Sequence, residues 1–147
     1  MQLTRFTDLA LRIVMRLSVL EEGESATTTA LAEQLRVRPA HAAKVVTALG
    51  RLGVVETRRG RSGGLSLAET ARDTSVGRIV RELEGPGEVV ECDGAEPCPL
   101  RTGCRLRHAL REAQEAFYAS LDQLTIGDVA AAPTRALLLS IGSGPTD

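Results

Sequence analysis

Aromatic residues are scarce in this sequence, which has no tryptophan, one tyrosine and two phenylalanines among 147 residues. Proteins that bind single-stranded nucleic acid stack its bases on aromatic side chains, so this class is disfavoured. A long apolar run is also missing, because four charged residues interrupt the N-terminal segment: Arg5, Asp8, Arg12 and Arg16. We therefore expect no signal peptide, no membrane span and a cytoplasmic protein.

Histidine and cysteine are few as well. His41 and His108 are the two histidines, and neither belongs to a nucleophile–base pattern, so we do not expect an enzyme. The glycine-rich segment 60–64 lacks the lysine ending and the strand-to-helix context of a phosphate-binding loop. Three cysteines are an odd number, and in a reducing cytosol they are better explained as ligands than as disulfide partners.

What the sequence does have is aliphatic residues at helical spacing. Thr7 is a candidate cap for the first helix, with Asp8 in its first turn, and Thr28 or Thr29 for the second. Pro39 suits the first position of the third helix, and Gly53 suits its end. The ranges expected to be helical are about 6–20, 30–35, 39–52, 74–83, 104–124 and 126–131.

The second and third of these helices flank a tight turn at 36–38, which is the helix-turn-helix pattern. Residues 54–58 and 65–68 are expected to pair as a β-hairpin, the wing, around a glycine-rich loop. The predicted fold class is therefore mainly α with a small β-hairpin wing: a winged helix-turn-helix followed by a long dimerisation helix. The expected domains are 1–72 for DNA binding, 73–140 for the cysteine loop and dimerisation, and a disordered tail at 141–147.

Positive charge is concentrated between residues 36 and 61, where seven basic residues and one acidic residue give a net +6 (7 − 1) in a chain of net charge −1. Such asymmetry is typical of a DNA-binding face, although a solvated basic surface is an equal alternative from charge alone. In the third helix we expect Arg38, His41 and Lys44 to face the major groove, and Thr47 and Arg51 to contact the DNA backbone. Arg59 and Arg61 at the wing tip are candidates for the minor groove. His41 could equally be a surface histidine without a role.

The long helix carries an apolar stripe close to a heptad seam. The stripe consists of Leu106, Leu110, Ala113, Phe117, Leu121 and Leu124. It could belong to the core of a single chain, but a helix this long in a small protein favours pairing with a second copy. A homodimer would carry two DNA-binding heads, for which an inverted-repeat operator is expected.

Cys92, Cys98 and Cys104 are evenly spaced, with five residues between neighbours, among polar and charged residues rather than in an apolar core. Structural zinc sites usually have paired cysteine knuckles, which are missing here, so an iron–sulfur cluster is favoured over zinc and over free thiols. Three thiolates leave one iron without a protein ligand. The candidates for the fourth ligand are Asp8, Asp93, Glu96 and His108, and the spacing does not choose among them.

Several segments resemble the NsrR family of nitric-oxide-sensing repressors, to about residue 138. They are Leu3-Thr4-Arg5-Phe6-Thr7-Asp8 with Leu11-Arg12, the wing 59–64, the helix 77–84 and the cysteine triad. The related IscR family of cluster-biogenesis regulators has the same cysteine spacing but a histidine ligand three residues after the last cysteine. Arg107 occupies that position here, which favours the NsrR family.

The resemblance implies a 4Fe-4S cluster, favoured over 2Fe-2S, with Asp8 of the partner subunit as the fourth ligand. It also implies that nitric oxide displaces Asp8 and that the operator is then released. Without the resemblance, Asp8 would be assigned to an ion pair with Arg12 on the same helix face. The alternative functions are an IscR-like sensor of cluster or redox state, a zinc-stabilised repressor, and a carrier of electrons or clusters.

Overall fold

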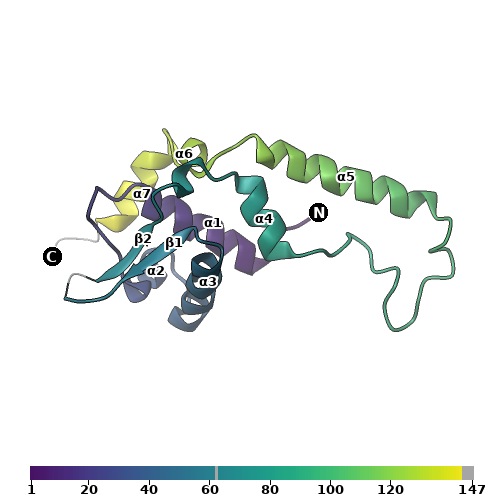
Figure 1. The fold of residues 1–147 in the computed structure, drawn as a ribbon, viewed down its shortest axis with the longest axis horizontal. Helices are drawn as coiled ribbons and strands as arrows, with labels where there is room; N and C mark the ends of the chain where they lie inside the picture. Colours follow the sequence, from purple (N-terminus) through teal and green to yellow (C-terminus); the bar gives the residue numbers. More distant parts are fainter. Residues whose placement is uncertain (62, 144–147) are drawn as a thin grey trace.

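The structure is a computed structural model that describes residues 1–61 and 63–143. A long helix, α5, projects from a head formed by the remaining elements (Figure 1). In the described part of the chain, no helix combines the length and the apolar character that a membrane crossing requires. In chain order the elements are α1 (Arg5–Ser18), α2 (Thr28–Gln34), α3 (Pro39–Arg51), β1 (Val55–Arg58), β2 (Gly64–Leu67), the 3-10 helix η1 (Ala71–Asp73), α4 (Val76–Glu84), α5 (Arg105–Asp122), α6 (Ile126–Val129) and α7 (Thr134–Gly142).

The core of the head forms around α1, which contacts α3, α4, α6, α7 and β2. Ile13 and Val14 of α1 are fully buried against Leu31 of α2 and against Val45 and Leu49 of α3. Each fully buried aliphatic side chain contributes about 1.5–3 kcal/mol to the free energy of unfolding. The helical spacing predicted for α1 and α3 is confirmed, because these aliphatic residues form one buried face on each helix.

The start of α1 differs from the sequence prediction. Thr4, not Thr7, caps the helix, and the Thr4 hydroxyl accepts a hydrogen bond from the Thr7 amide at 3.2 Å. Thr7 itself is fully buried in the first turn. The reason is tertiary: the amide and hydroxyl of Thr4 both donate to Oε1 of Glu84 at the end of α4, at 2.9 and 3.0 Å.

The start of α2 also differs, since Thr27 rather than Thr28 or Thr29 is its N-cap. Thr27, Thr28 and Thr29 are almost equally suited to be the N-cap, so a tertiary contact of the preceding residue selects which of them caps α2. Ala26 forms a β-bridge with Leu65, with N–O distances of 2.9 and 2.7 Å, and thereby places the chain for a cap one residue later. Arg36 in the following turn has a φ of 55°, and this left-handed residue ends α2 as a C-terminal cap does.

The hairpin of β1 and β2 confirms the predicted wing. The strands are antiparallel, with Val55 opposite Leu67 and Arg58 opposite Gly64. Gly60 has a φ of 118°, which a residue with a side chain rarely adopts, so a glycine is needed at this turn. Residue 62 of the expected wing loop lies outside the described residues.

The long helix α5 packs on α4 through its C-terminal half. Tyr118 is buried against Val76 and Val80, with Phe117 and Leu121 beside it. Tyr118 was not among the residues of the predicted apolar stripe. The stripe itself differs along its length: Phe117 and Leu121 are partly buried, whereas 66% of Leu106 is exposed. The stripe therefore packs within the chain through Phe117 and Leu121, and the pairing of Leu106 with a second copy stays a prediction.

The C-terminal segment returns to the head. Thr125 caps α6 and forms a capping box with Asp128. A further helix, α7, was not predicted, and it packs Leu138 against Val19 and Ala130. It extends through Gly142, so the expectation of a disordered tail from residue 141 is wrong for the first two residues. The rest of that expectation lies at 144–147, outside the described residues, and the domain division at residue 72 stays a prediction.

Candidate functional site

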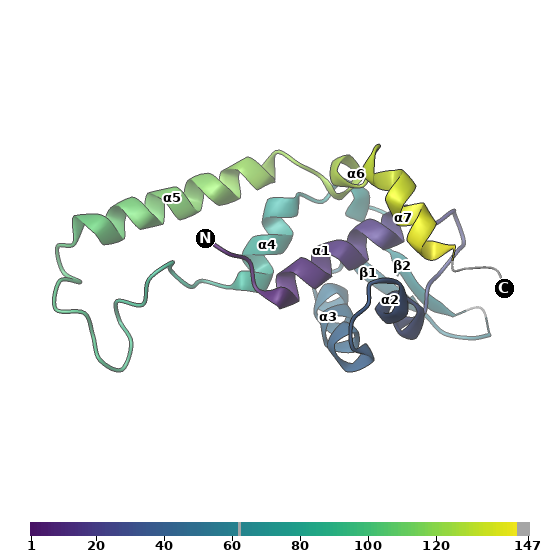
Figure 2. The same cartoon turned by 180° about the vertical axis from the view of Figure 1, so that it is seen from behind.

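The exposed side of α3 carries the positive charge that the sequence predicts to contact DNA. Arg38 is the N-cap residue of α3, and Arg38, Lys44 and Arg51 are all exposed. In both ribbon views α3 and the hairpin extend to the side of the head opposite α6 (Figures 1 and 2). These cations are therefore accessible to an extended anionic partner.

Two other predicted contacts on α3 are partly engaged within the chain. The Thr47 hydroxyl donates to the carbonyl oxygen of Ala43 at 2.9 Å, so it is left to act as an acceptor. The His41 ring is half-buried, and its centroid lies 6.2 Å from that of Phe6 on α1. His41 therefore contributes to the packing of α3 on α1, whatever it does toward DNA.

The wing places Arg59 and Arg61 at its exposed end, as predicted. Arg58, which the sequence prediction counted only toward the overall charge, is exposed beside them at the end of β1. At Gly63, a Cβ atom would lie 2.5 Å from the carbonyl oxygen of Arg58, so the tight return of the chain requires a glycine. The wing is thus a narrow basic projection.

The three cysteines lie on the segment between α4 and α5, which we call the cysteine loop (residues 85–104). All three thiols are free, and the Cys98 amide donates to the Cys92 carbonyl oxygen at 3.0 Å. Cys92 is buried, contrary to the expectation of exposure among polar residues, and burial raises the pKa of its thiol while the nearby Arg107 charge opposes the rise. Cys104 is the N-cap residue of α5, and its Sγ accepts a hydrogen bond from the Arg107 amide at 3.4 Å.

The structure does not bring a complete ligand set together. Within residues 1–61 and 63–143, no three His, Cys, Asp or Glu side chains converge as a metal site. Asp93 is paired with Arg107 and Arg101, and the exposed His108 lies 3.6 Å from Glu112. The Arg107 guanidinium has no lone pair to offer, so it does not replace the histidine ligand of the IscR family.

The other candidate ligands are Asp8 and Glu96, and Glu96 is exposed on the cysteine loop. Asp8 forms a two-point ion pair with Arg12, with atom distances of 2.7 and 3.0 Å. The Asp8 side chain is 49% exposed, and exposed pairs of this kind contribute little to stability. Asp8 is therefore available to a partner outside its own chain, and the identity of the fourth ligand stays a prediction.

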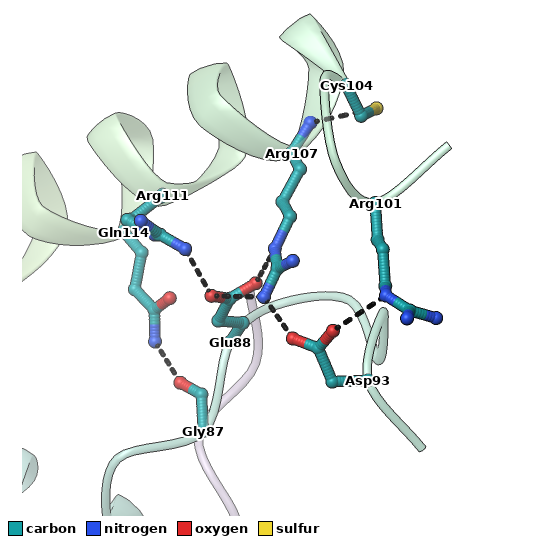
Figure 3. A network of polar contacts seen from close by, with 8 residues as sticks. All are labelled: Gly87, Glu88, Asp93, Arg101, Cys104, Arg107, Arg111 and Gln114. Carbon is teal, nitrogen blue, oxygen red and sulfur yellow. Dashed lines mark hydrogen bonds and ion pairs between the residues drawn. The ribbon is translucent and has the colours of Figure 1, made fainter. Parts of the chain in front are cut away.

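A network of charged residues joins the cysteine loop to α5 (Figure 3). Glu88 pairs with Arg107 and Arg111, whose hydrogen bonds lower the pKa of Glu88 to about 2. This network was not predicted from the sequence. The signal for it was two arginines spaced one helical turn apart, Arg107 and Arg111, in the helix that follows the last cysteine, with acidic residues in the preceding loop.

The sequence profile of the Rrf2 family, described as an iron-dependent transcriptional regulator, matches residues 3–132. This range includes the cysteine loop, α5 and every element of the head except α7. The chain belongs to the Rrf2 family. The resemblance noted from the cysteine triad and the N-terminal motif thus extends over most of this Rrf2 protein.

Curated relatives agree with this assignment. A transcriptional repressor named NsrR from Streptomyces coelicolor is 58% identical over 147 residues, which cover 99% of each chain. A regulator named NsrR from Geobacillus kaustophilus is 42% identical over 131 residues, covering 88% of this chain and 89% of the relative. The similarity to the NsrR group predicted from the motifs is confirmed.

Solved structures confirm the fold class. The structure of T. potens IscR matches this Rrf2 protein with a TM-score of 0.69 over 88% of this chain and 85% of its own, at 19% identity. CymR of B. subtilis matches with a TM-score of 0.62 over 88% and 96% of the two chains, at 25% identity. The winged-helix head with a long helix is therefore an arrangement that this chain shares with other regulators of the family.

Proposed function

We propose that this Rrf2 protein is a cytoplasmic, homodimeric transcriptional repressor that binds an inverted-repeat operator and releases it in response to nitric oxide. Relatives at 58% and 42% identity are named as a repressor and a regulator of the NsrR group. The exposed cations of α3 and the wing suit the major groove and the adjacent backbone. The free thiols of the cysteine loop supply the site at which a signal could enter.

The observation that carries the proposal is the attachment of the cysteine loop to the DNA-binding head. The loop follows directly on Glu84, whose carboxylate accepts both hydrogen bonds from Thr4 at the start of α1. Helix α1 in turn packs on α3, the predicted recognition helix. A rearrangement of the loop can therefore reach α3 through two packed helices.

The donor set fits an iron–sulfur cluster. Cys92, Cys98 and Cys104 are free thiols on one irregular loop, and soft thiolates are the ligands that such clusters prefer. We propose that these three residues and the partner subunit's Asp8 hold a 4Fe-4S cluster, which supplies, when bound, an iron that reacts with nitric oxide. A carboxylate oxygen is a hard donor and is therefore the weakest member of this set.

The exposed half of α5 supports the dimer that this ligand set requires. Leu106 is 66% exposed, and Ala109 and Ala113 are exposed on the same helix. An apolar stripe on a projecting helix loses its contact with water when a second copy of the helix packs on it. In such a dimer the cysteine loop of one chain could meet the head of the other.

The ion pair of Asp8 and Arg12 suggests how the chain itself would switch. When Asp8 serves as a ligand to the partner, it leaves Arg12 and joins one head to the other chain's cysteine loop. When Asp8 is displaced, it returns to Arg12, with which it pairs at 2.7 Å in the single chain. The two heads then lose their fixed spacing, and a coupling of about 1–3 kcal/mol would lower operator affinity roughly 5- to 150-fold.

The proposal is tested by anaerobic DNA binding. Duplexes selected from a random pool by the cluster-loaded protein would be titrated with the loaded, nitric-oxide-treated and metal-free forms. We expect tight binding by the loaded form only, and Lys44→Ala as a control that weakens binding and lowers its salt dependence. Equal affinity of all three forms would refute the proposal. A colourless, zinc-loaded protein would instead support the zinc-stabilised repressor.

The fourth ligand gives a separate prediction. We expect Asp8→Ala to change the visible absorption of the loaded protein and to accelerate its loss of iron to a chelator by about tenfold, because a ligand has been removed. His108→Ala is the matched control, since His108 is exposed and lies against Glu112, and it should leave both readouts unchanged. The opposite pattern would assign the ligand to His108.

A further inference from the structure

Arg107 lies at the centre of the network that joins the cysteine loop to α5 (Figure 3). Its Nε atom lies 2.7 Å from Oε2 of Glu88, and its Nη2 atom lies 3.1 Å from Oε1 of Glu88 and 2.5 Å from Oδ2 of Asp93. Only 18% of the Arg107 side chain is exposed, compared with 55% for Arg111, which also pairs with Glu88. A single guanidinium thus bridges two carboxylates from different parts of the loop.

The same residue also contacts the cysteines or their neighbours. The Arg107 amide donates to Sγ of Cys104 at 3.4 Å, and its side chain holds Asp93, which directly follows Cys92. The Cys92 carbonyl oxygen accepts the Cys98 amide at 3.0 Å. The Arg107 side chain thus acts on the residue next to Cys92, its backbone amide contacts Cys104, and Cys98 is hydrogen-bonded to Cys92.

We infer that Arg107 is a positioning residue, whose side chain holds the Cys92 segment of the cysteine loop on α5, the helix that Cys104 caps, before any metal binds. The planar fork of arginine is required for this role, because it can engage Glu88 at two points and still reach Asp93. The inference rests on the proposed function in one respect, namely that the positioned thiols serve to bind a cluster. The placement itself is a property of the metal-free chain.

The neighbouring Arg105 offers a matched control. It is exposed on the first turn of α5, and its side chain makes no ion pair with the part of the chain described here. Arg105→Ala and Arg107→Ala therefore remove the same charge at nearly the same position of the same helix. Any difference between the two variants reports the contacts of Arg107 rather than the charge of the helix.

The test uses the reduced, metal-free, full-length protein and hydrogen exchange measured by mass spectrometry. We expect Arg107→Ala to speed exchange in peptides from 85–104 by about tenfold, since a network of several ion pairs is lost, and Arg105→Ala to leave it unchanged. Glu88→Gln should loosen the loop too, and the double variant should be little worse than Arg107→Ala alone. Thermal unfolding of each variant is the check that the head remains folded.

A second readout separates positioning from charge. After anaerobic reconstitution, we expect the visible circular dichroism of the cluster to change in Arg107→Ala and in Arg107→Lys, because an ammonium cannot replace the fork. Full restoration by lysine, or loop exchange equal to the wild type in Arg107→Ala, would overturn the inference. If the wild type binds no cluster, the proposed function fails while the exchange result still decides the role of Arg107.

Discussion

Cys98→Ala is expected to give a protein that purifies anaerobically without colour and with less iron than one cluster per chain. Two thiolates and a carboxylate are too few soft donors to retain a 4Fe-4S cluster. Cys98 is the preferred site because Cys104 also caps α5 and Cys92 is buried, so their loss would disturb the apo structure as well. Operator affinity should fall by the coupling factor, roughly 5- to 150-fold.

The measurements are iron and sulfide content, visible absorbance and anaerobic operator titration. Thr102→Ala is the matched control, because Thr102 is an exposed residue of the same loop and should leave iron content and affinity unchanged. A Cys98 variant that keeps a full complement of iron would exclude Cys98 from the ligand set. A variant that loses iron but binds the operator normally would contradict the dependence of binding on the cluster.

Gly77→Ala is expected to disturb the packing of α5 on α4 and to lower the free energy of unfolding by about 1–3 kcal/mol, because the interface of the two helices has no room for a side chain at this position. A Cβ atom at Gly77 would lie 2.1 Å from Oδ1 of Asp122 and 2.7 Å from the Asp122 amide nitrogen. The change also disturbs the ion pair of Asp122 with Arg81, whose guanidinium lies 4.5 Å from the ring centroid of Tyr118.

Thermal unfolding of the metal-free protein, followed by far-ultraviolet circular dichroism, measures this effect. A loss of that size corresponds to a fall in Tm of roughly 2–12 °C for a chain of this length. Gly87→Ala is the control, because nothing lies within 4 Å of a Cβ at Gly87, and its Tm should stay near that of the wild type. An unchanged Tm in Gly77→Ala would contradict the prediction that close packing at Gly77 contributes to the stability of the protein.

The helices of the head could be predicted from the sequence because their burial is periodic. Ile13 and Leu17 on α1 are four positions apart, as are Val45 and Leu49 on α3, and all four are buried in the structure. The first residue of a helix is harder to predict. For α1, both Thr4 and Thr7 have side chains that suit an N-cap. The hydrogen bonds from Thr4 to Glu84, 80 positions away, select the first of them.

The candidate site could be predicted only in part, for a related reason. The basic run of α3 and the wing is local, and it is exposed as predicted. The role of Arg107 is not local: its partners Glu88 and Asp93 lie 19 and 14 positions away, on a loop with no regular period. The sequence marked Arg107 only by the absence of a histidine.

The sequence by itself determined the helix-turn-helix, the wing and the clustering of three cysteines, because hydrophobic period, turn residues and ligand spacing act over a few neighbouring positions. Only the tertiary structure decided which half of α5 is buried, since Tyr118 packs on α4 while Leu106 extends past it. It also decided how the cysteine loop is held, because the loop lies where Arg107 can reach two carboxylates at once. Such contacts join residues that are distant in the sequence, so they cannot be predicted from patterns of neighbouring residues.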